Sequence, residues 1–242
     1  APWSARASCA TFVCDGPDEP ISPPQAAPDR SRVVFTGTGN STGIPLPQCL
    51  LEMKDEPECH VSQLAMRGSP DRNRNYRCNP ALLIQHRAAS GKLSNIQIDV
   101  GKTFKESVLR WYPRFGVDHL DAVIVTHDHA DAMMGMDDLR TVQQLPRNKK
   151  IGEMAFAREA IPPLPVFVGS RHMEKVQNTF PYLVPQESVE DVPRFTARLA
   201  WTPVEDFEVF SCPSGLEILP VPVYHGGTYT CQAFVFGKSD RV

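Results

Sequence analysis

The sequence lacks any long apolar run, and its 242 residues show no excess of one charge. No stretch approaches the roughly 20 consecutive apolar residues that a transmembrane helix requires, so we expect no membrane partner. The 25 basic and 28 acidic side chains nearly cancel, which disfavours recognition of nucleic acid through overall charge. Any such partner would have to be recognised by a local patch. With 41% hydrophobic residues, the chain can bury the core of one α/β domain.

The cysteines also lack a pattern. They are seven in number, which is odd, and they are scattered along the chain. Such usage favours a reducing compartment over secretion, so we expect an intracellular protein, with the cytoplasm favoured and an organelle not excluded. Residues 1–30 are rich in Pro, Ala, Ser and Asp and lack the apolar segment of a secretory signal. This composition predicts a disordered leader, followed by one domain over residues 31–242.

The middle of the chain alternates between strand-like and helix-like segments, which predicts an α/β fold. A glycine-rich loop, 37–45, follows the first expected strand, but its spacing and Pro45 argue against a dinucleotide-binding fingerprint. We expect an irregular insertion at residues 48–80 and a connecting segment at 147–165. Apolar runs bounded by turn residues predict strands at 32–36, 81–86, 95–101, 123–125, 166–169, 216–223 and 231–237. Apolar periodicity and stop signals predict helices at 103–113, 131–145 and 171–180.

One expected strand stops abruptly in two histidines and two carboxylates. The run Val123–Val125 is followed by Thr126-His127-Asp128-His129-Ala130-Asp131. Histidines at i and i+2 after a strand can bind one ion, and Asp131 can join them or face a neighbouring ion. His225 follows another expected strand and is the natural third nitrogen ligand. Three protein ligands leave a coordination position for water, which acquires a pKa near 7 and becomes a nucleophile.

A surface loop that contains H-x-H by chance is the alternative interpretation, and we consider it weaker because three histidines share strand ends. For the isolated histidines we instead expect structural or surface roles. These are His60, His86, His119 and His172.

Three segments in order resemble the metallo-β-lactamase-fold superfamily: 35–45, Ile98-Asp99-Val100-Gly101, and 126–131. The glycine segment resembles the branch that contains ribonuclease Z, the phosphonate-pathway cyclic phosphodiesterase and the pyrroloquinoline-quinone biosynthesis protein B. The resemblance spans about residues 32–237 and implies a four-layer αβ/βα sandwich with metal at the sheet edge. It also implies hydrolysis of a phosphodiester or related ester. His127, His129 and His225 would then hold the first metal, and Asp131 the second.

Two departures limit this transfer. The superfamily pattern is H-x-H-x-D-H, and Ala132 stands at the position of its last histidine. Further ligands, an Asp and a His, are expected downstream of the position reached at Gly237, whereas this chain ends at Val242. We therefore expect a sandwich that is incomplete at its C-terminus. Asp138, seven residues after Asp131, can compensate if both lie on one helix face, although a solvated face or an ion pair with Arg140 explains it as well.

Two further groups invite a functional reading. Four residues of the insertion could hold a structural zinc, although buried thiols explain them equally well: Cys49, Cys59, His60 and Cys78. Four arginines between Arg67 and Arg77 could steer a phosphate-bearing substrate, whereas a solvated loop is the simpler explanation.

The sequence thus supports a metal-dependent hydrolase with one or two ions, zinc being expected and manganese or iron being alternatives. A small phosphodiester is the expected substrate, and nucleic acid is less favoured. Asp131 would hold a second ion or orient the attacking water, and Asp99 would brace the ligand loops. The alternative is a metal-binding protein that keeps the fold but does not catalyse hydrolysis. The sequence does not define an oligomeric state.

Overall fold

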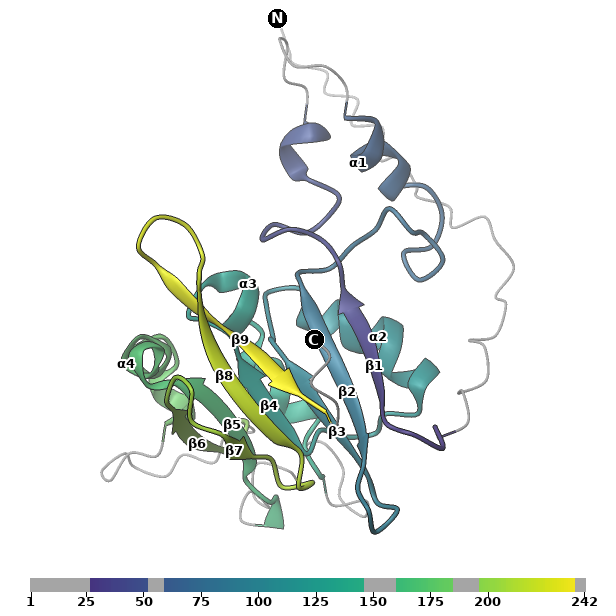
Figure 1. The fold of residues 1–242 in the computed structure, drawn as a ribbon. Coiled ribbons are helices and arrows are strands. Elements are labelled where there is room, and N and C mark those ends of the chain that lie inside the picture. Colours follow the sequence, from purple (N-terminus) through teal and green to yellow (C-terminus); the bar gives the residue numbers. More distant parts are fainter. Residues whose placement is uncertain (1–26, 52–58, 146–159, 185–195, 238–242) are drawn as a thin grey trace, which may run out of the picture.

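The computed structural model describes residues 27–51, 59–145, 160–184 and 196–237, which form two sheets (Figure 1). In the six-stranded sheet the strands follow chain order, antiparallel from β1 to β3 and parallel from β3 to β6. Its strands are β1 (Arg32–Gly37), β2 (Ala81–Arg87), β3 (Leu93–Ile98), β4 (Ala122–Val125), β5 (Leu164–Gly169) and β6 (Leu199–Val204). The antiparallel three-stranded sheet contains β7 (Phe210–Ser211), β8 (Glu217–Tyr224) and β9 (Thr230–Phe236).

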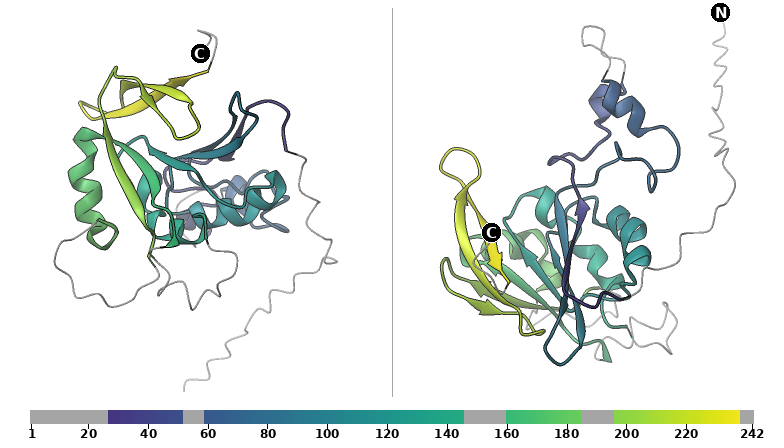
Figure 2. Two further views of the ribbon diagram at one scale, coloured as in Figure 1. Left: turned by 90° about the horizontal axis from the view of Figure 1, so that it is seen from below. Right: turned by 45° about the vertical axis from the view of Figure 1, so that its right-hand side comes forward.

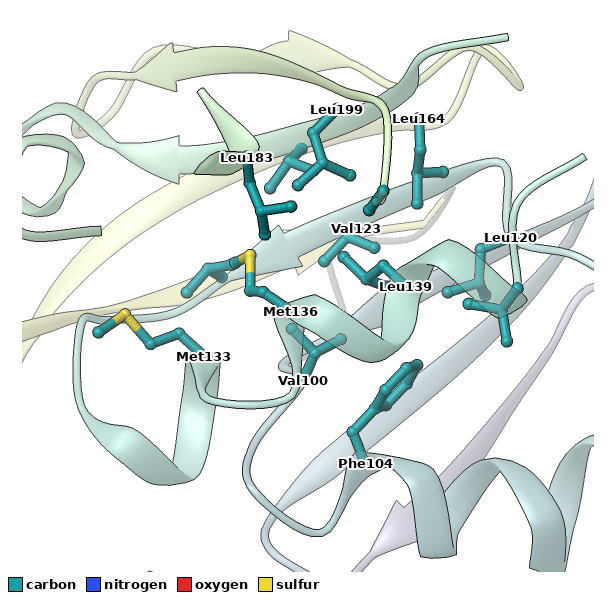
Figure 3. Packing of buried hydrophobic residues seen from close by; sticks show 14 of the residues in the cluster. Val100, Phe104, Leu120, Val123, Met133, Met136, Leu139, Leu164, Leu183 and Leu199 are labelled. Atoms are coloured by element: carbon teal, nitrogen blue, oxygen red, sulfur yellow. The ribbon is translucent and has the colours of Figure 1, made fainter. Parts of the chain in front are cut away.

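The six-stranded sheet is covered on both faces, because its buried strands alternate between two cores. Val123 and Val125 of β4 face a core shared with helices α2 (Phe104–Phe115) and α4 (Ser170–Thr179). Ile124, between them, faces a core shared with the three-stranded sheet. Figure 2 shows the three-stranded sheet and the helices on opposite faces, and Figure 3 shows packing on the helical side. The described residues therefore supply the helical layer and both sheets of the expected sandwich.

The remaining elements are short. They lie within the expected insertion, between β4 and β5, and after α4. They are η1 (Pro47–Cys49), α1 (His60–Ala65), α3 (Ala130–Met133), η2 (Met136–Thr141) and η4 (Pro181–Leu183). Most of the expected leader, and most of the expected connection at 147–165, lie outside the described residues.

The single helix predicted over 131–145 is wrong, because the chain breaks into α3 and η2 at Gly135. The Gly135 amide donates to Val100 O over 2.7 Å. A Cβ at this position would lie 2.4 Å from Gly101 O and 2.5 Å from Phe104 Cβ. This close approach fixes the turn at Gly135, so tertiary packing overrides the helical periodicity of the segment.

The helix predicted over 103–113 runs two residues further, and its predicted capping box does not form. α2 continues through Pro113 to Phe115 and ends on Gly116, whose φ of 64° is the left-handed conformation of a helix C-terminus. Thr103 makes no capping bond to the helix backbone. Its hydroxyl donates to Asn79 Oδ1 at 3.1 Å and accepts from the Asn79 amide at 2.8 Å. Asn79 thus competes successfully for the hydroxyl that would cap the helix.

Candidate metal centre

Three histidines from both sheets converge at one edge of the molecule. His127 and His129 follow β4, and His225 follows β8 in the three-stranded sheet. One nitrogen from each ring lies within 4.8 Å of a nitrogen of each other ring. The His127 ring centroid lies 4.7 Å from that of His129 and 4.5 Å from that of His225. Within the described ranges, no other group of three His, Cys, Asp or Glu side chains meets this criterion.

The state of His127 fits a metal ligand. Its Nε2 is buried and has no hydrogen-bond partner, and a buried polar atom without a partner is costly. Burial lowers the pKa of His127 to about 4, and the other imidazoles act in the same direction. The ring is therefore neutral near pH 7. Since a metal ligand must present an unprotonated nitrogen, the three-histidine cluster is suited to a transition-metal ion.

A hydrogen-bonded relay sets the orientation of His127. Thr126 Oγ1 lies 2.8 Å from His127 Nδ1 and donates to Asp99 Oδ2 over 2.8 Å. With the hydroxyl proton directed at Asp99, the oxygen accepts from Nδ1–H and leaves the Nε2 lone pair for the cluster. Burial raises the pKa of Asp99 to about 7, against the hydrogen bonds from Thr126 that lower it. Asp99 thus contacts the ligand loop (residues 126–131) through Thr126.

Asp131 lies at the cluster, whereas Ala132 cannot contribute to it. Asp131 Oδ1 lies 3.9 Å from His127 Nε2, so the carboxylate faces the side on which an ion would bind. Ala132 is buried, and its carbonyl accepts from the Val100 amide. A Cβ on Gly101 would lie 1.9 Å from Asp131 O. The glycine therefore allows the 99–101 loop to pack directly beneath the ligand loop.

Asp128 lies between His127 and His129 in sequence and forms a second hydrogen-bond network. Its carboxylate accepts from Lys175 Nζ at 2.8 Å, from the Tyr229 hydroxyl at 2.7 Å, and contacts His172 Nδ1 at 3.0 Å. Burial would raise the pKa of Asp128, but the hydrogen bonds from Lys175, Tyr229 and His172 outweigh it and hold that pKa at about 2. Asp128 is therefore ionised. Its carboxylate is occupied by these three partners rather than available as a metal ligand.

The other candidate residues lie elsewhere. Asp138 is in the 3₁₀ helix η2, so the two-turn spacing from Asp131 on an α-helix does not exist. Arg140 pairs with Asp137, at 3.1 Å, rather than with Asp138. The arginines of the insertion are exposed, as a solvated loop requires: Arg67, Arg72, Arg74 and Arg77.

The four residues considered for a structural zinc are not gathered into one group within the described part of the chain. Cys59 contacts Ser62 and Cys49 near α1. Cys78 is buried elsewhere, against the start of α2, where burial raises its pKa. The insertion therefore places these thiols in two separate environments.

Sequence reasoning missed the side chains that surround the ligands. His172, for which a structural or surface role is expected, is buried, and the sequence does not indicate its contact with Asp128. The Tyr229 ring stacks on His129, with centroids 4.5 Å apart and an interplanar angle of 11°. The proximity of Tyr229 to His225 in the sequence was the available signal, because both flank one short turn.

Comparison with known proteins identifies the family of this chain. Residues 94–241 match the model of the Beta-lactamase superfamily domain. The chain belongs to this superfamily, as its mixed sheets and edge histidines indicate.

The alignments with individual relatives cover only part of this chain and part of each relative. Octanoyltransferase from Porphyromonas gingivalis (strain ATCC BAA-308 / W83) is 37% identical over 111 residues, which are 46% of this chain and 18% of that protein. Zn²⁺-bound PqqB from Methylobacterium extorquens is 13% identical, with a TM-score of 0.47, over 84% of this chain and 58% of that chain. Human tRNase Z, short form, is 10% identical, with a TM-score of 0.48, over 85% and 63%. The chain thus spans less than a fifth of the curated relative.

Proposed function

We propose that this protein is a metal-dependent hydrolase of a small phosphodiester or related ester. The observation that carries the proposal is the convergence of His127, His129 and His225 within 4.8 Å, with the Nε2 of His127 buried and unpartnered. Zinc suits three neutral imidazoles, and manganese and iron are accepted by similar ligands. A bound ion would supply Lewis-acid polarisation of the ester oxygen and a lower pKa for water.

The protein side chains would divide the remaining work. Asp131 faces the cluster, 3.9 Å from His127 Nε2, so its carboxylate can orient an attacking water and accept its proton, or contribute to a second ion. The water oxygen then bonds to phosphorus, one ester P–O bond breaks, and the proton passes to the departing oxygen. Asp99 acts at a distance, because its bonds to Thr126 fix the ring that Thr126 contacts.

The experiment is turnover of an aryl phosphodiester, bis(p-nitrophenyl) phosphate, by metal-loaded protein whose metal content has been measured. We expect His127→Ala to lose the bound metal and, with it, turnover by a factor of at least about 100, as expected when a ligand rather than its surroundings is removed. His119→Ala is the matched control, because His119 bonds to Asp118 and Gln144. Wild-type protein that holds metal but turns over no ester would contradict the hydrolase proposal.

That outcome would support a second candidate, a metal-binding protein without catalysis. Ala132 favours this candidate, since a buried methyl group replaces the histidine expected for a second ion. Metal stoichiometry separates the two: two ions per chain together with turnover supports the hydrolase, and one ion without turnover supports the alternative.

We further propose a small substrate rather than a polynucleotide, and an intracellular, cytoplasmic location without a membrane partner. None of the five cysteines in the described segments forms a disulfide, which suits a reducing compartment. Across those same segments, no helix has the length and apolarity to cross a membrane. Binding of a small ester should depend weakly on salt, whereas an RNA substrate held by many phosphate contacts would bind far more weakly as salt rises.

A further inference from the structure

The third histidine of the cluster is held differently from the other two. His127 is buried directly after a strand of the six-stranded sheet, whereas His225 is exposed and opens the turn between β8 and β9. This turn contains Gly226 and Gly227, with φ of 102° and 55°. A Cβ on either glycine would meet no atom within 4 Å. The turn therefore gains little from packing, and something else must hold His225 at the cluster.

Tyr229 closes the other end of the turn and links it to the ligand loop. Its carbonyl accepts from the His225 amide over 2.8 Å, and its amide donates to Gly226 O over 3.0 Å. Its ring stacks on His129, and its hydroxyl donates to Asp128 Oδ1 over 2.7 Å. One side chain thus connects the backbone that carries His225 with the loop that carries the other two histidines.

Asp128 is itself fixed by helix α4. His172 and Lys175 lie one turn apart on this helix and contact the two oxygens of the Asp128 carboxylate, at 3.0 Å and 2.8 Å. The side chains of His172 and Asp128 are 3% and 7% exposed. Because these contacts fix the Asp128 carboxylate, it is a rigid acceptor for the hydroxyl group of Tyr229 from the three-stranded sheet.

We propose that the Tyr229–Asp128 hydrogen bond is a latch that fastens the β8–β9 turn to α4 and so positions His225 in the metal centre. Tyr229 is a positioning residue, because it acts through His225 and touches no reacting atom. The inference rests on the proposed metal centre for its consequence, but the latch itself is a property of the protein chain alone. Partners that orient metal ligands typically change metal affinity by about 10- to 100-fold when they are removed.

The test is Tyr229→Phe, which deletes the hydroxyl group and keeps the ring that stacks on His129. Tyr224→Phe is the matched control, since Tyr224 lies on the same hairpin and is 83% exposed. In protein stripped of metal, we expect faster amide hydrogen exchange in 225–229 for Tyr229→Phe alone. In competition with a chelator, we expect its zinc affinity to fall about 10-fold or more, with the control unchanged.

A double variant tests whether the two side chains act as a unit. Asp128→Asn weakens the same bond from the other side, so Tyr229→Phe should cost much less in the Asp128→Asn background than alone. Additive losses, or unchanged exchange and unchanged zinc affinity in Tyr229→Phe, would overturn the latch while leaving the metal centre in place. Failure of the wild type to bind zinc would instead overturn the proposed function, and the exchange measurement would then decide the latch alone.

Discussion

Asp99 carries a left-handed backbone directly behind the ligand loop. Its φ is 61°, a conformation that costs a residue with a Cβ on the order of 1 kcal/mol or more. Its carboxylate receives both the amide and the hydroxyl of Thr126, at 2.8 Å each. Such strain persists only where surrounding contacts over-determine it. The left-handed turn at Asp99 places its carboxylate against Thr126, whose hydroxyl also contacts His127.

Thr126→Val tests how much these hydrogen bonds contribute to stability, because it removes the hydroxyl group and keeps the shape of the side chain. His127 Nδ1 then loses its partner in a part-buried site, which costs about 1–3 kcal/mol of the free energy of unfolding. The urea midpoint of the metal-free protein measures this loss, and zinc affinity should fall with it. Thr126→Ser restores the hydroxyl group and should behave like the wild type. A Thr126→Val protein with wild-type stability and affinity would show that the relay is not needed.

The three histidines that the structure brings together could be predicted from the sequence, whereas the residues around them could not. His127, His129 and Asp131 sit in one local pattern after an apolar run, and His225 follows a second run. Tyr229 and Asp128 are 101 residues apart, and a single hydroxyl on a turn has no sequence pattern that names its acceptor. A motif shows which groups bind, but the contacts that orient them depend on tertiary packing.

Gly135 decides how the chain leaves the ligand loop. It divides the segment between β4 and β5 into α3 and η2, and it allows Val100 O and Gly101 O to approach the turn. Because Gly101 packs in the same way against Asp131 O, the two glycines place the 99–101 loop and the ligand loop in direct backbone contact. The helical segment after β4 therefore breaks at Gly135, where these backbone contacts form, although its periodicity predicts one continuous helix.

Gly135→Ala should therefore destabilise the fold. The added Cβ would lie 2.4 Å from a backbone oxygen, and such overpacking of a rigid site costs about 1–3 kcal/mol, occasionally more. Gly91→Ala is the control, because its Cβ would meet no atom within 4 Å and only its φ of 84° opposes the change, at about 1 kcal/mol. Urea denaturation of both variants gives the comparison. Gly135 has an ordinary φ of −91°, so a loss no larger than that of Gly91→Ala would contradict the close approach as the reason for the glycine at 135.

The strands also differ in how clearly the sequence predicts them. β4 and β5 are buried and largely apolar runs, and β2 and β3 carry several apolar residues beside polar ones, so local sequence marks these four strands. β6 is an edge strand that mixes buried and exposed residues and includes Pro203, and β7 has two residues. Edge strands tolerate proline and need no continuous apolar pattern, so neither could be recognised. The strands predicted at 81–86 and 95–101 correspond to β2 and β3, which pair antiparallel.

The histidine cluster contains residues from both sheets, which also share a hydrophobic core. His127 and His129 follow a strand of the six-stranded sheet, and His225 follows a strand of the three-stranded sheet. The three-stranded sheet covers the face of the six-stranded sheet that lies opposite the helices (Figure 2). An ion bound by all three would connect these layers at their edge. Since only the folded chain brings the three rings together, metal affinity adds directly to folding stability.

Zinc should therefore raise the thermal unfolding temperature of the wild type, and His225→Ala should lose that rise. At a free zinc concentration 100 times the dissociation constant, the stabilisation is about 2.7 kcal/mol. His225 is exposed, so its removal should change the metal-free stability by only about 0.5 kcal/mol or less. Circular dichroism melts with zinc and with chelator measure both quantities. If His225→Ala retained the full zinc-dependent shift, the ion would be held by the six-stranded sheet alone, and the cluster would not join the two layers.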